Sequence, residues 1–160
     1  MHSTAIQIVK TLQKAGYKAY FAGGCVRDML LKKDPKDYDI ATSALPEQIE
    51  KLFAETYAVG KNFGVINVLE DGHTFEVATF RSDSGTSDGR RPDAVTFTHA
   101  EEDAKRRDFT INGLFYDPVG DEILDFVGGQ NDLTNRLIRF IGVPHERILE
   151  DHLRIIRAIR

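Results

Sequence analysis

Asp37 and Asp39 are the residues whose types and spacing most directly suggest chemistry. We predict a short strand from Asp37 to Ala41, and side chains alternate along a strand, so both carboxylates should leave the same face about 7 Å apart. Two such carboxylates and a triphosphate form a typical Mg²⁺ site. Two ions there could activate a hydroxyl and neutralise a leaving pyrophosphate. The same spacing also occurs in solvated loops.

Gly23 and Gly24 precede this pair, between a predicted strand and a predicted helix. Two glycines at such a corner let backbone N–H groups approach a phosphate, and Arg27 can bind a triphosphate oxygen. The third glycine of a dinucleotide-binding fingerprint is absent. The corner therefore indicates a phosphate-binding turn, and an ordinary tight turn is the alternative.

A basic group occupies a helical stretch that we predict from Glu101 to Leu114. Within it Arg106, Arg107 and Asp108 are followed by Asn112, which places charged groups and an amide within about one and a half turns. A solvated helix face is the alternative, since runs of charge usually have that role.

The last charged set lies on a helix predicted from Ile148 to Arg160. Its members recur in steps of three, which keeps them on one stripe. They are Asp151, Arg154, Arg157 and Arg160. Asp and Arg together can match the donors and acceptors of a nucleobase edge, and an exposed face held by ion pairs is the alternative. No residue that ends a helix follows, so we expect the sequence to stop inside this element.

Helical and strand patterns interchange along the rest of the chain, which predicts a mixed sheet with helices. Helical patterns cover 5–15, 26–30 and a segment opened by Leu45-Pro46-Glu47, and strand patterns cover 18–22, 65–69 and 74–80, with further strands around Phe115 and Ile123. Asp71-Gly72 suits the turn of a hairpin. The polar stretch from Arg81 to Asp93 predicts a long exposed loop.

Composition sets outer bounds on the function. The 160 residues suit one domain, or one domain and the start of another. The net charge of −4 means that any contact with nucleic acid must come from a local patch or from sequence outside this chain. Cys25 is the single cysteine, which excludes an internal disulfide and fits a reducing compartment. No apolar run is long enough for a membrane span, so we predict a soluble protein of the cytoplasm.

Four motifs in a fixed order resemble the class II tRNA nucleotidyltransferase and bacterial poly(A) polymerase family. They are Gly23-Gly24-x-Val26-Arg27-Asp28, Asp37-x-Asp39, Arg106-Arg107-Asp108-x-x-x-Asn112 and Glu150-Asp151-x-x-Arg154-x-x-Arg157-Ala158. The resemblance runs from Tyr20 to Arg160. It implies an α+β, DNA polymerase β-like nucleotidyltransferase fold, with a mixed sheet flanked by helices in a head domain over 1–140 and the truncated start of a helical neck over 141–160.

The resemblance also implies a reaction. An RNA 3′-hydroxyl would attack the α-phosphate of CTP or ATP in a Mg²⁺-dependent step, adding CMP and AMP to the 3′ end of tRNA. The RNA would be held mainly by sequence beyond Arg160. The stretch Asp88-Gly89-Arg90-Arg91-Pro92 resembles a flexible loop that helps such a site change from C to A addition.

Residue roles follow from the same resemblance. Asp37 and Asp39 match the metal-binding catalytic carboxylates, and Gly23, Gly24 and Arg27 match the triphosphate corner. Arg107, Asp108 and Asn112 match nucleotide contacts, as do Arg157 and Arg160. Asp151 and Arg154 match the pair that reads the base. Glu76 is our candidate for a third carboxylate, because it lies on a nearby predicted strand and polymerase-like sites often use three.

Three alternatives share parts of this pattern. A poly(A) polymerase or A-adding enzyme has the same motifs, and a non-catalytic module could bind nucleotides without transferring them. A phosphatase of the haloacid-dehalogenase type also uses D-x-D, but its first aspartate ends an apolar strand. Here the polar residues Lys33 to Lys36 come first, which disfavours that class.

Overall fold

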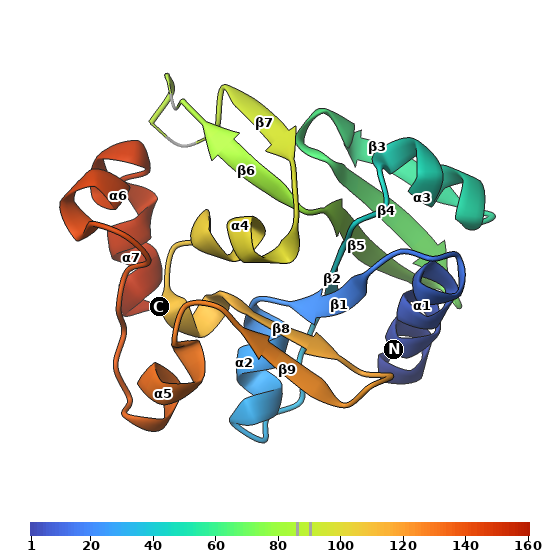
Figure 1. The fold of residues 1–160 in the computed structure, drawn as a ribbon, viewed down its shortest axis with the longest axis horizontal. Coiled ribbons are helices and arrows are strands. Elements are labelled where there is room, and N and C mark those ends of the chain that lie inside the picture. Colours follow the sequence, from blue (N-terminus) through green and yellow to red (C-terminus); the bar gives the residue numbers. More distant parts are fainter. Residues whose placement is uncertain (86, 90) are drawn as a thin grey trace.

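A seven-stranded sheet organises the computed structural model, which describes residues 1–85, 87–89 and 91–160 (Figure 1). Its strands are β1 Ala19–Ala22, β2 Asp39–Thr42, β3 Thr56–Gly60, β4 Val65–Glu70, β5 His73–Thr79, β8 Leu114–Asp117 and β9 Glu122–Asp125. They lie in the order β3-β4-β5-β2-β1-β8-β9. β2 pairs with β5 in parallel and the other pairings are antiparallel, so the predicted mixed sheet is confirmed.

The helices are short, apart from the first. They are α1 His2–Lys14, α2 Gly24–Leu30, α3 Pro46–Leu52, α4 Ala100–Lys105, α5 Gly129–Thr134, α6 Pro144–Glu150 and α7 Leu153–Ile159, with 3₁₀ turns η1 Lys61–Phe63 and η2 Thr110–Asn112. Among the described residues, no helix is long and apolar enough to cross a membrane.

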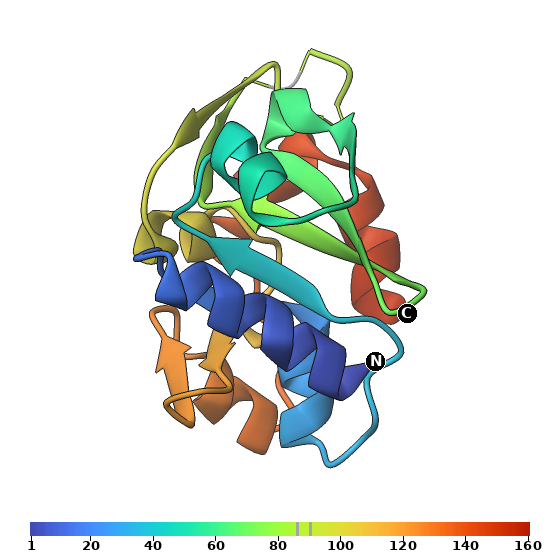
Figure 2. The same ribbon diagram turned by 90° about the vertical axis from the view of Figure 1, so that its right-hand side faces the viewer.

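One face of the sheet carries the main core. The apolar stripe of α1, which includes Ile8 and Leu12, is buried against strand residues such as Phe21, Ile40 and Val77, and Figure 2 shows α1 packed along the sheet. Burying one such side chain completely stabilises the fold by about 1.5–3 kcal/mol. The predicted first helix is therefore confirmed, with Leu12 near its end.

The opposite face of β4 and β5 stays open. Phe75 and Val77 of β5 are buried, whereas Glu76 between them is exposed. Alternation along the strand accounts for this division. The sheet thus presents a polar face to solvent next to the start of β2.

The predicted loop from Arg81 to Asp93 is wrong at its beginning. Arg81–Ser84 forms strand β6, which pairs with β7, Ala94–Phe97, in a separate hairpin. The Arg81 guanidinium donates to the Phe63 carbonyl, and the Arg81 amide donates to Asp103. These two bonds to residues elsewhere in the chain hold a strand whose polar side chains do not predict one. Arg90, in the predicted flexible loop, lies outside the described residues.

The helix predicted from Glu101 to Leu114 is confirmed up to Lys105 and wrong beyond it. α4 ends at Lys105, so Arg106, Arg107 and Asp108 lie in the turn that follows. The Asp108 carboxylate accepts the Phe109 amide, and the Asp108 carbonyl accepts the Ile141 amide. One local bond and one bond to a distant segment thus replace the next helical turn.

The helix predicted from Ile148 to Arg160 is broken at Asp151. Asp151 has extended dihedral angles, φ −150° and ψ 105°, between α6 and α7. Its carboxylate accepts the amide of Leu153, the first residue of α7. The single stripe predicted for Asp151, Arg154, Arg157 and Arg160 therefore does not include Asp151. The division into 1–140 and 141–160 stays a prediction.

Candidate active site

The three predicted carboxylates stand at the edge between the open sheet face and the glycine corner. Asp39 is the first residue of β2, and Glu76 on the adjacent β5 directly precedes Val77, the partner of Ile40. Asp37 lies just before β2 and not within it, which corrects the predicted strand start. Tyr38 is buried, and the aspartates on either side of it are exposed, as alternation requires.

A hydrogen bond anchors this segment from behind. The Tyr38 hydroxyl lies 3.0 Å from Nδ1 of His2 at the start of α1, and the Tyr38 ring packs on Phe21. The buried ring therefore fixes the backbone between the two aspartates to the core.

The electrostatics of Asp39 favour a cation. Although Asp39 is exposed by area, the surrounding protein removes part of its water, and this desolvation raises the pKa of its carboxyl. The neighbouring Glu76 and Asp37 carboxylates raise that pKa further, and Arg107 opposes them. A divalent ion would relieve this repulsion.

The donor set fits magnesium only with help from a ligand. Among the described residues, no three His, Cys, Asp or Glu side chains form a complete metal-binding group. Magnesium is usually held by one or two carboxylates, with phosphate and water oxygens completing its shell. Asp37 and Asp39, with Glu76 nearby, are suitable for that arrangement.

The glycine corner requires glycine at its first position. Gly23 has φ +72°, a conformation that L side chains rarely adopt, and a Cβ there would lie 3.2 Å from Nη1 of Arg107. The Gly23 amide donates to the Leu114 carbonyl. Gly24 begins α2, so the predicted strand-to-helix corner is confirmed.

A polar network runs from this corner to the C-terminal helix. Nη1 of Arg27 donates to Oδ1 of Asn112 at 2.8 Å, and Nδ2 of Asn112 is 3.5 Å from Oδ1 of Asp108. The other oxygen of Asp108 is 3.2 Å from Nε of Arg157, and Nη2 of Arg157 is 2.6 Å from Asp151. Residues from three separated motifs thus form one connected network.

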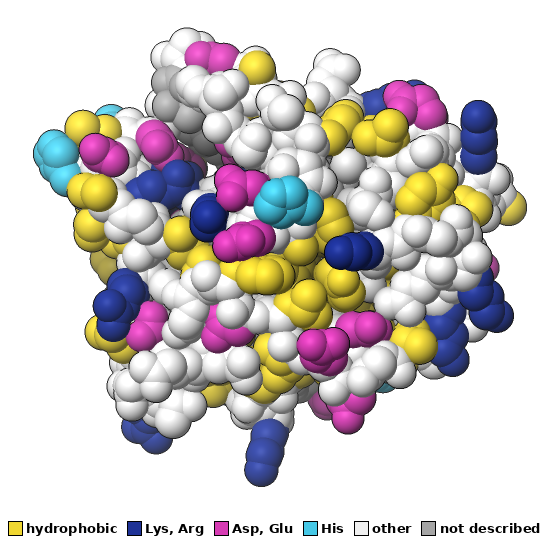
Figure 3. Space-filling model, viewed as in Figure 1, with side chains coloured by type: hydrophobic (Ala, Val, Ile, Leu, Met, Phe, Trp, Pro, Cys, Tyr) yellow, Lys and Arg dark blue, Asp and Glu magenta, His cyan; other side chains and the backbone are white. Residues whose placement is uncertain are grey.

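A cleft of about 460 Å³ opens over this network. Ten of the predicted residues line it: Gly23, Gly24, Arg27, Asp39, Arg107, Asp108, Asn112, Arg154, Arg157 and Arg160. Asp37, Glu76 and Asp151 do not line it. Arg81 and Arg106 add further positive charge to its wall. On the face shown in Figure 3, by contrast, acidic and basic side chains are scattered.

Asp103 is the main residue that the sequence patterns missed. Its side chain is 1% exposed, and its two oxygens accept from Arg106 and Arg107 at 3.3 and 3.0 Å. Burial raises its pKa, but Arg107 and Arg106 lower it more strongly, so the pKa of Asp103 lies below its usual value. Burial also lowers the pKa of Arg106, to about 10. The spacing of Asp103 three and four residues before these arginines was an available signal.

Arg147 is a second residue without a predicted role. Its Nη2 donates to the carbonyls of Arg106 and Arg107, at 2.5 and 2.7 Å, and its own carbonyl accepts from Arg154. Glu150 accepts from both arginines. α6 and α7 are thereby attached to the turn after α4.

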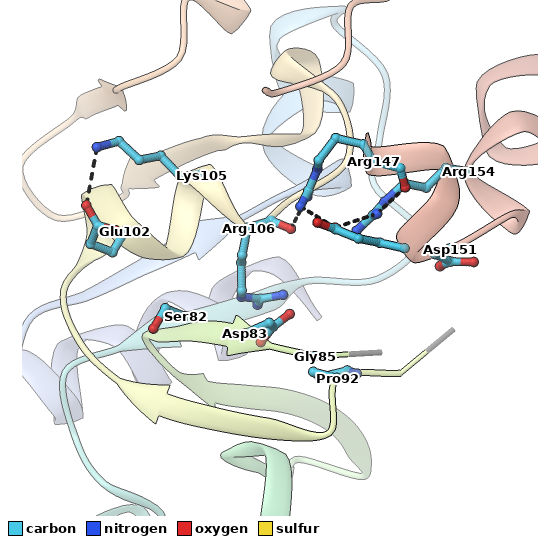
Figure 4. A pocket seen from close by; sticks show the side chains of 11 residues that line it. Ser82, Asp83, Gly85, Pro92, Glu102, Lys105, Arg106, Arg147, Asp151 and Arg154 are labelled. Atoms are coloured by element: carbon cyan, nitrogen blue, oxygen red, sulfur yellow. Dashed lines mark hydrogen bonds and ion pairs between the residues drawn. The ribbon is translucent and has the colours of Figure 1, made fainter. Parts of the chain in front are cut away.

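A second hollow of about 370 Å³ adjoins this attachment. Figure 4 shows Arg147 and Arg154 from α6 and α7 on one side of it, and Asp83 and Pro92 from the hairpin region on the other. Asp151 borders this hollow and is 5% exposed, so it is less accessible from the main cleft than Arg154.

Comparison with known proteins gives consistent matches. Residues 19–139 match the family model described as the poly A polymerase head domain. A CCA-adding enzyme of Lactobacillus delbrueckii subsp. bulgaricus is 48% identical over 157 residues, covering 98% of this chain and 39% of the relative. A CCA-adding enzyme of Enterococcus faecalis is 50% identical over 157 residues, covering 98% of this chain and 38% of the relative.

Two solved structures are also similar. The Bacillus stearothermophilus CCA-adding enzyme in complex with CTP has a TM-score of 0.87 at 42% identity, covering 98% of this chain and 38% of that one. A tRNA nucleotidyltransferase complexed with a primer tRNA and an incoming ATP analog has a TM-score of 0.73 at 29% identity, covering 97% of this chain and 43% of that one. This chain therefore spans about two fifths of the length of the proteins it resembles.

Proposed function

This chain belongs to the poly A polymerase head domain family, and on that premise we propose that the protein containing it adds CMP and AMP from CTP and ATP to the 3′ end of tRNA. One observation carries the proposal. Asp39, the glycine corner and the arginines of three separate motifs line a single cleft. Such a cleft can hold a triphosphate beside a carboxylate pair.

Each group in the cleft has a task in this reaction. Gly23, Gly24 and Arg27 hold the triphosphate, and the charges of Arg107 and Arg157 compensate its negative oxygens. Arg107 is well placed because Asp103 fixes its guanidinium from behind. Preorganised charges of this kind stabilise a transition state without having to reorient during the reaction.

The carboxylates complete the site at its other end. Asp37 and Asp39 would hold magnesium, with Glu76 as a third carboxylate, and magnesium, when bound, supplies positive charge at the reacting phosphate. Asp39 also orients the acceptor hydroxyl for in-line attack on the α-phosphate and accepts its proton, so that the oxygen forms the new P–O bond while the bond from the α-phosphorus to the bridging oxygen breaks and pyrophosphate leaves.

Base choice is assigned to the C-terminal pair. Arg154 lines the cleft and is held by the Arg147 carbonyl and Glu150, so its donors have a fixed direction. Asp151, held by Arg157 and by the Leu153 amide, borders the adjoining hollow, so it would supply the acceptor once its carboxylate turned toward the cleft. A donor and an acceptor at fixed positions can distinguish one base edge from another. Cys25 is buried and unpaired with another cysteine, and we propose the cytoplasm as the site of action.

Incorporation assays test the proposal. The natural protein that carries this chain is incubated with Mg²⁺, single nucleoside triphosphates and tRNA lacking its terminal nucleotides, and the products are sequenced. We expect CMP and AMP to be added in the order that completes CCA. Products containing only A would instead indicate an A-adding enzyme or a poly(A) polymerase, and binding of CTP by calorimetry without incorporation would indicate a binding module.

A further inference from the structure

The two aspartates of the carboxylate pair are held to the fold in different ways. Asp39 lies in β2, where it pairs with Ala22 of β1. Asp37 lies outside that strand. Among the described residues, those from 34 to 38 form no hydrogen bond between backbone groups. The position of Asp37 therefore depends on what holds its neighbour, Tyr38.

Tyr38 is held through its side chain, which is 7% exposed. Its hydroxyl oxygen lies 3.0 Å from Nδ1 of His2, the first residue of α1. The His2 ring also packs against the rings of Tyr38 and Phe21, with centroids 5.2 and 6.0 Å away. Figure 2 shows the start of α1 beside the segment that leads into β2. An exposed residue of α1 thus contacts the buried ring that adjoins both aspartates.

We propose that His2 is a positioning residue for the metal site. By holding the Tyr38 hydroxyl, it keeps the Asp37 carboxylate beside Asp39, so that both can bind one magnesium ion. Magnesium demands near-ideal octahedral geometry, and a ligand that must first be ordered binds less tightly. The inference rests on the magnesium site proposed above, and it adds a residue far along the chain to that site.

The contact can be removed without removing α1. The helix is docked by Ile8 and Leu12, which are buried further along it, whereas His2 is exposed. Loss of the His2 nitrogen should therefore loosen the segment before β2 and leave the core in place.

Two substitutions at one position isolate the nitrogen. The amide of His2→Asn lies close to the place of Nδ1 and can still bond the hydroxyl, whereas His2→Leu has similar bulk and no polar atom. The probe is Mn²⁺, a paramagnetic substitute for magnesium, titrated by electron paramagnetic resonance into the natural protein that carries this chain, with CTP and without RNA. We expect His2→Leu to raise the dissociation constant for Mn²⁺ by about threefold to tenfold, the effect of one hydrogen bond. His2→Asn should stay close to the parent.

Tyr38→Phe removes the same bond from its other end and keeps the buried ring. Its dissociation constant for Mn²⁺ should match that of His2→Leu. Because both variants lose one shared interaction, the double variant should bind Mn²⁺ no more weakly than either single variant. Additive effects would show that the two residues act independently and would contradict the proposal.

Thr4→Val is the matched control on the same helix. Thr4 lies in the first turn of α1, is 6% exposed, and its hydroxyl donates to Asp71 at the β4–β5 turn at 3.1 Å. Its loss removes a similar contact that does not reach the segment before β2. The melting temperature of Thr4→Val can fall, but its dissociation constant for Mn²⁺ should stay as in the parent.

Incorporation assays should show the same division. In His2→Leu the magnesium concentration that gives half the maximal rate should rise, and kcat at saturating magnesium should stay close to that of the parent. A fall in kcat with an unchanged magnesium dependence would contradict a role in holding Asp37.

Asp39→Asn separates this inference from the site beneath it. If Asp39→Asn binds Mn²⁺ more weakly and His2→Leu binds it like the parent, the metal site stands and the role of His2 is wrong. If Asp39→Asn binds Mn²⁺ as tightly as the parent, the ion lies elsewhere, and the metal site and this inference both fail. Equal weakening in His2→Leu, His2→Asn and Thr4→Val would show that any loosening of α1 disturbs the site, and it would overturn the role of the hydrogen bond.

Discussion

Two aspartates of this molecule, Asp39 and Asp103, show opposite responses to their surroundings. Asp39 is exposed, yet its pKa is raised, through desolvation and the nearby Glu76 and Asp37 carboxylates. Asp103 is buried, yet its pKa is lowered, because two guanidiniums outweigh the cost of burial. Burial raises the pKa of both carboxyls, so the difference in direction comes from the neighbouring charges. Asp39 faces other carboxylates, whereas Asp103 already has two guanidiniums beside it.

This contrast divides the site into two functional parts. The region around Asp39 carries unbalanced negative charge and is suited to recruit an ion. The region around Asp103 is balanced, and its role is to hold Arg106 and Arg107 in place behind the cleft. Substitutions in the first region should therefore affect activity, and substitutions in the second should affect stability as well.

The largest expected effect is on turnover in Asp39→Asn. Loss of the ionised carboxylate removes charge stabilisation worth several kcal/mol, so we expect incorporation to fall by about a thousandfold or more. The circular dichroism spectrum should be unchanged, since Asp39 is exposed. Asp34→Asn, at a nearby exposed position, is the matched control. Incorporation by Asp39→Asn within tenfold of the parent would contradict the assignment.

Asp103→Asn should mainly destabilise the fold. The substitution leaves two partly buried guanidiniums without their anion, and breaking such a group typically costs about 3–5 kcal/mol. Urea unfolding of the parent and the variant at neutral pH measures the difference. Asp121→Asn, at an exposed turn, should change stability by less than about 0.5 kcal/mol.

Acidification should close this gap in stability. Because the folded-state pKa of Asp103 is lowered, its contribution is present above the ordinary value of 3.8 and is lost as the pH falls through the lowered value. The parent and Asp103→Asn should therefore differ fully at pH 7 and converge in strong acid. A gap that does not change with pH would argue against ion pairing as the source of the effect.

Arg147→Lys extends the comparison to a second anchor. Lysine keeps the charge but cannot reproduce the planar guanidinium that contacts Arg106, Arg107 and Glu150. We expect a loss of about 1–3 kcal/mol, with faster hydrogen exchange in α6 and α7. Lys105→Arg is the control, because Lys105 is exposed and, within the described part of the chain, its ion pairs are with Glu101 and Glu102 of its own helix. Unchanged exchange in α6 would show that this anchor is unimportant.

The smallest expected effect concerns Asp39 and stability. Its raised pKa means that ionisation is harder in the folded chain, so its contribution to stability falls as the pH rises from 3.8 through the raised value. Without divalent ions, Asp39→Asn should be more stable than the parent at pH 7, by no more than about 1 kcal/mol at this exposed position. Magnesium should stabilise the parent and leave the variant unchanged. Equal stabilisation of both would place the ion elsewhere.

Residue type and spacing were enough to find most of the cleft. Asp39, the glycines and Arg27 were predicted because few other residue types can bind a polyphosphate and its metal ion as carboxylate pairs, glycine corners and guanidiniums do. Asp103 and Arg147 were missed for the opposite reason. Each acts by holding other residues. The spacing of Asp103 to Arg106 and Arg107 is shared by many exposed helical ion pairs, and the bond from Arg147 to distant carbonyls leaves no pattern in sequence.

The errors in secondary structure have one physical origin. The turn at Asp108, the break at Asp151 and the strand at Arg81 all depend on hydrogen bonds with segments far along the chain or on bonds between a side chain and a nearby backbone amide. Helical periodicity cannot register such bonds, because it reports only which face of a segment is apolar.

By itself, the sequence determined the mixed fold, the core face of α1 and the identity of most groups in the cleft, because local periodicity and side-chain chemistry are carried by neighbouring residues. Only the tertiary structure decided how these groups meet. Pairing of β2 with β5 brings Glu76 to Asp39, and pairing of β1 with β2 brings Ala22, next to the glycine corner, to the other side of Asp39. Such contacts join residues separated by tens of positions, and their geometry exists only once the sheet has formed.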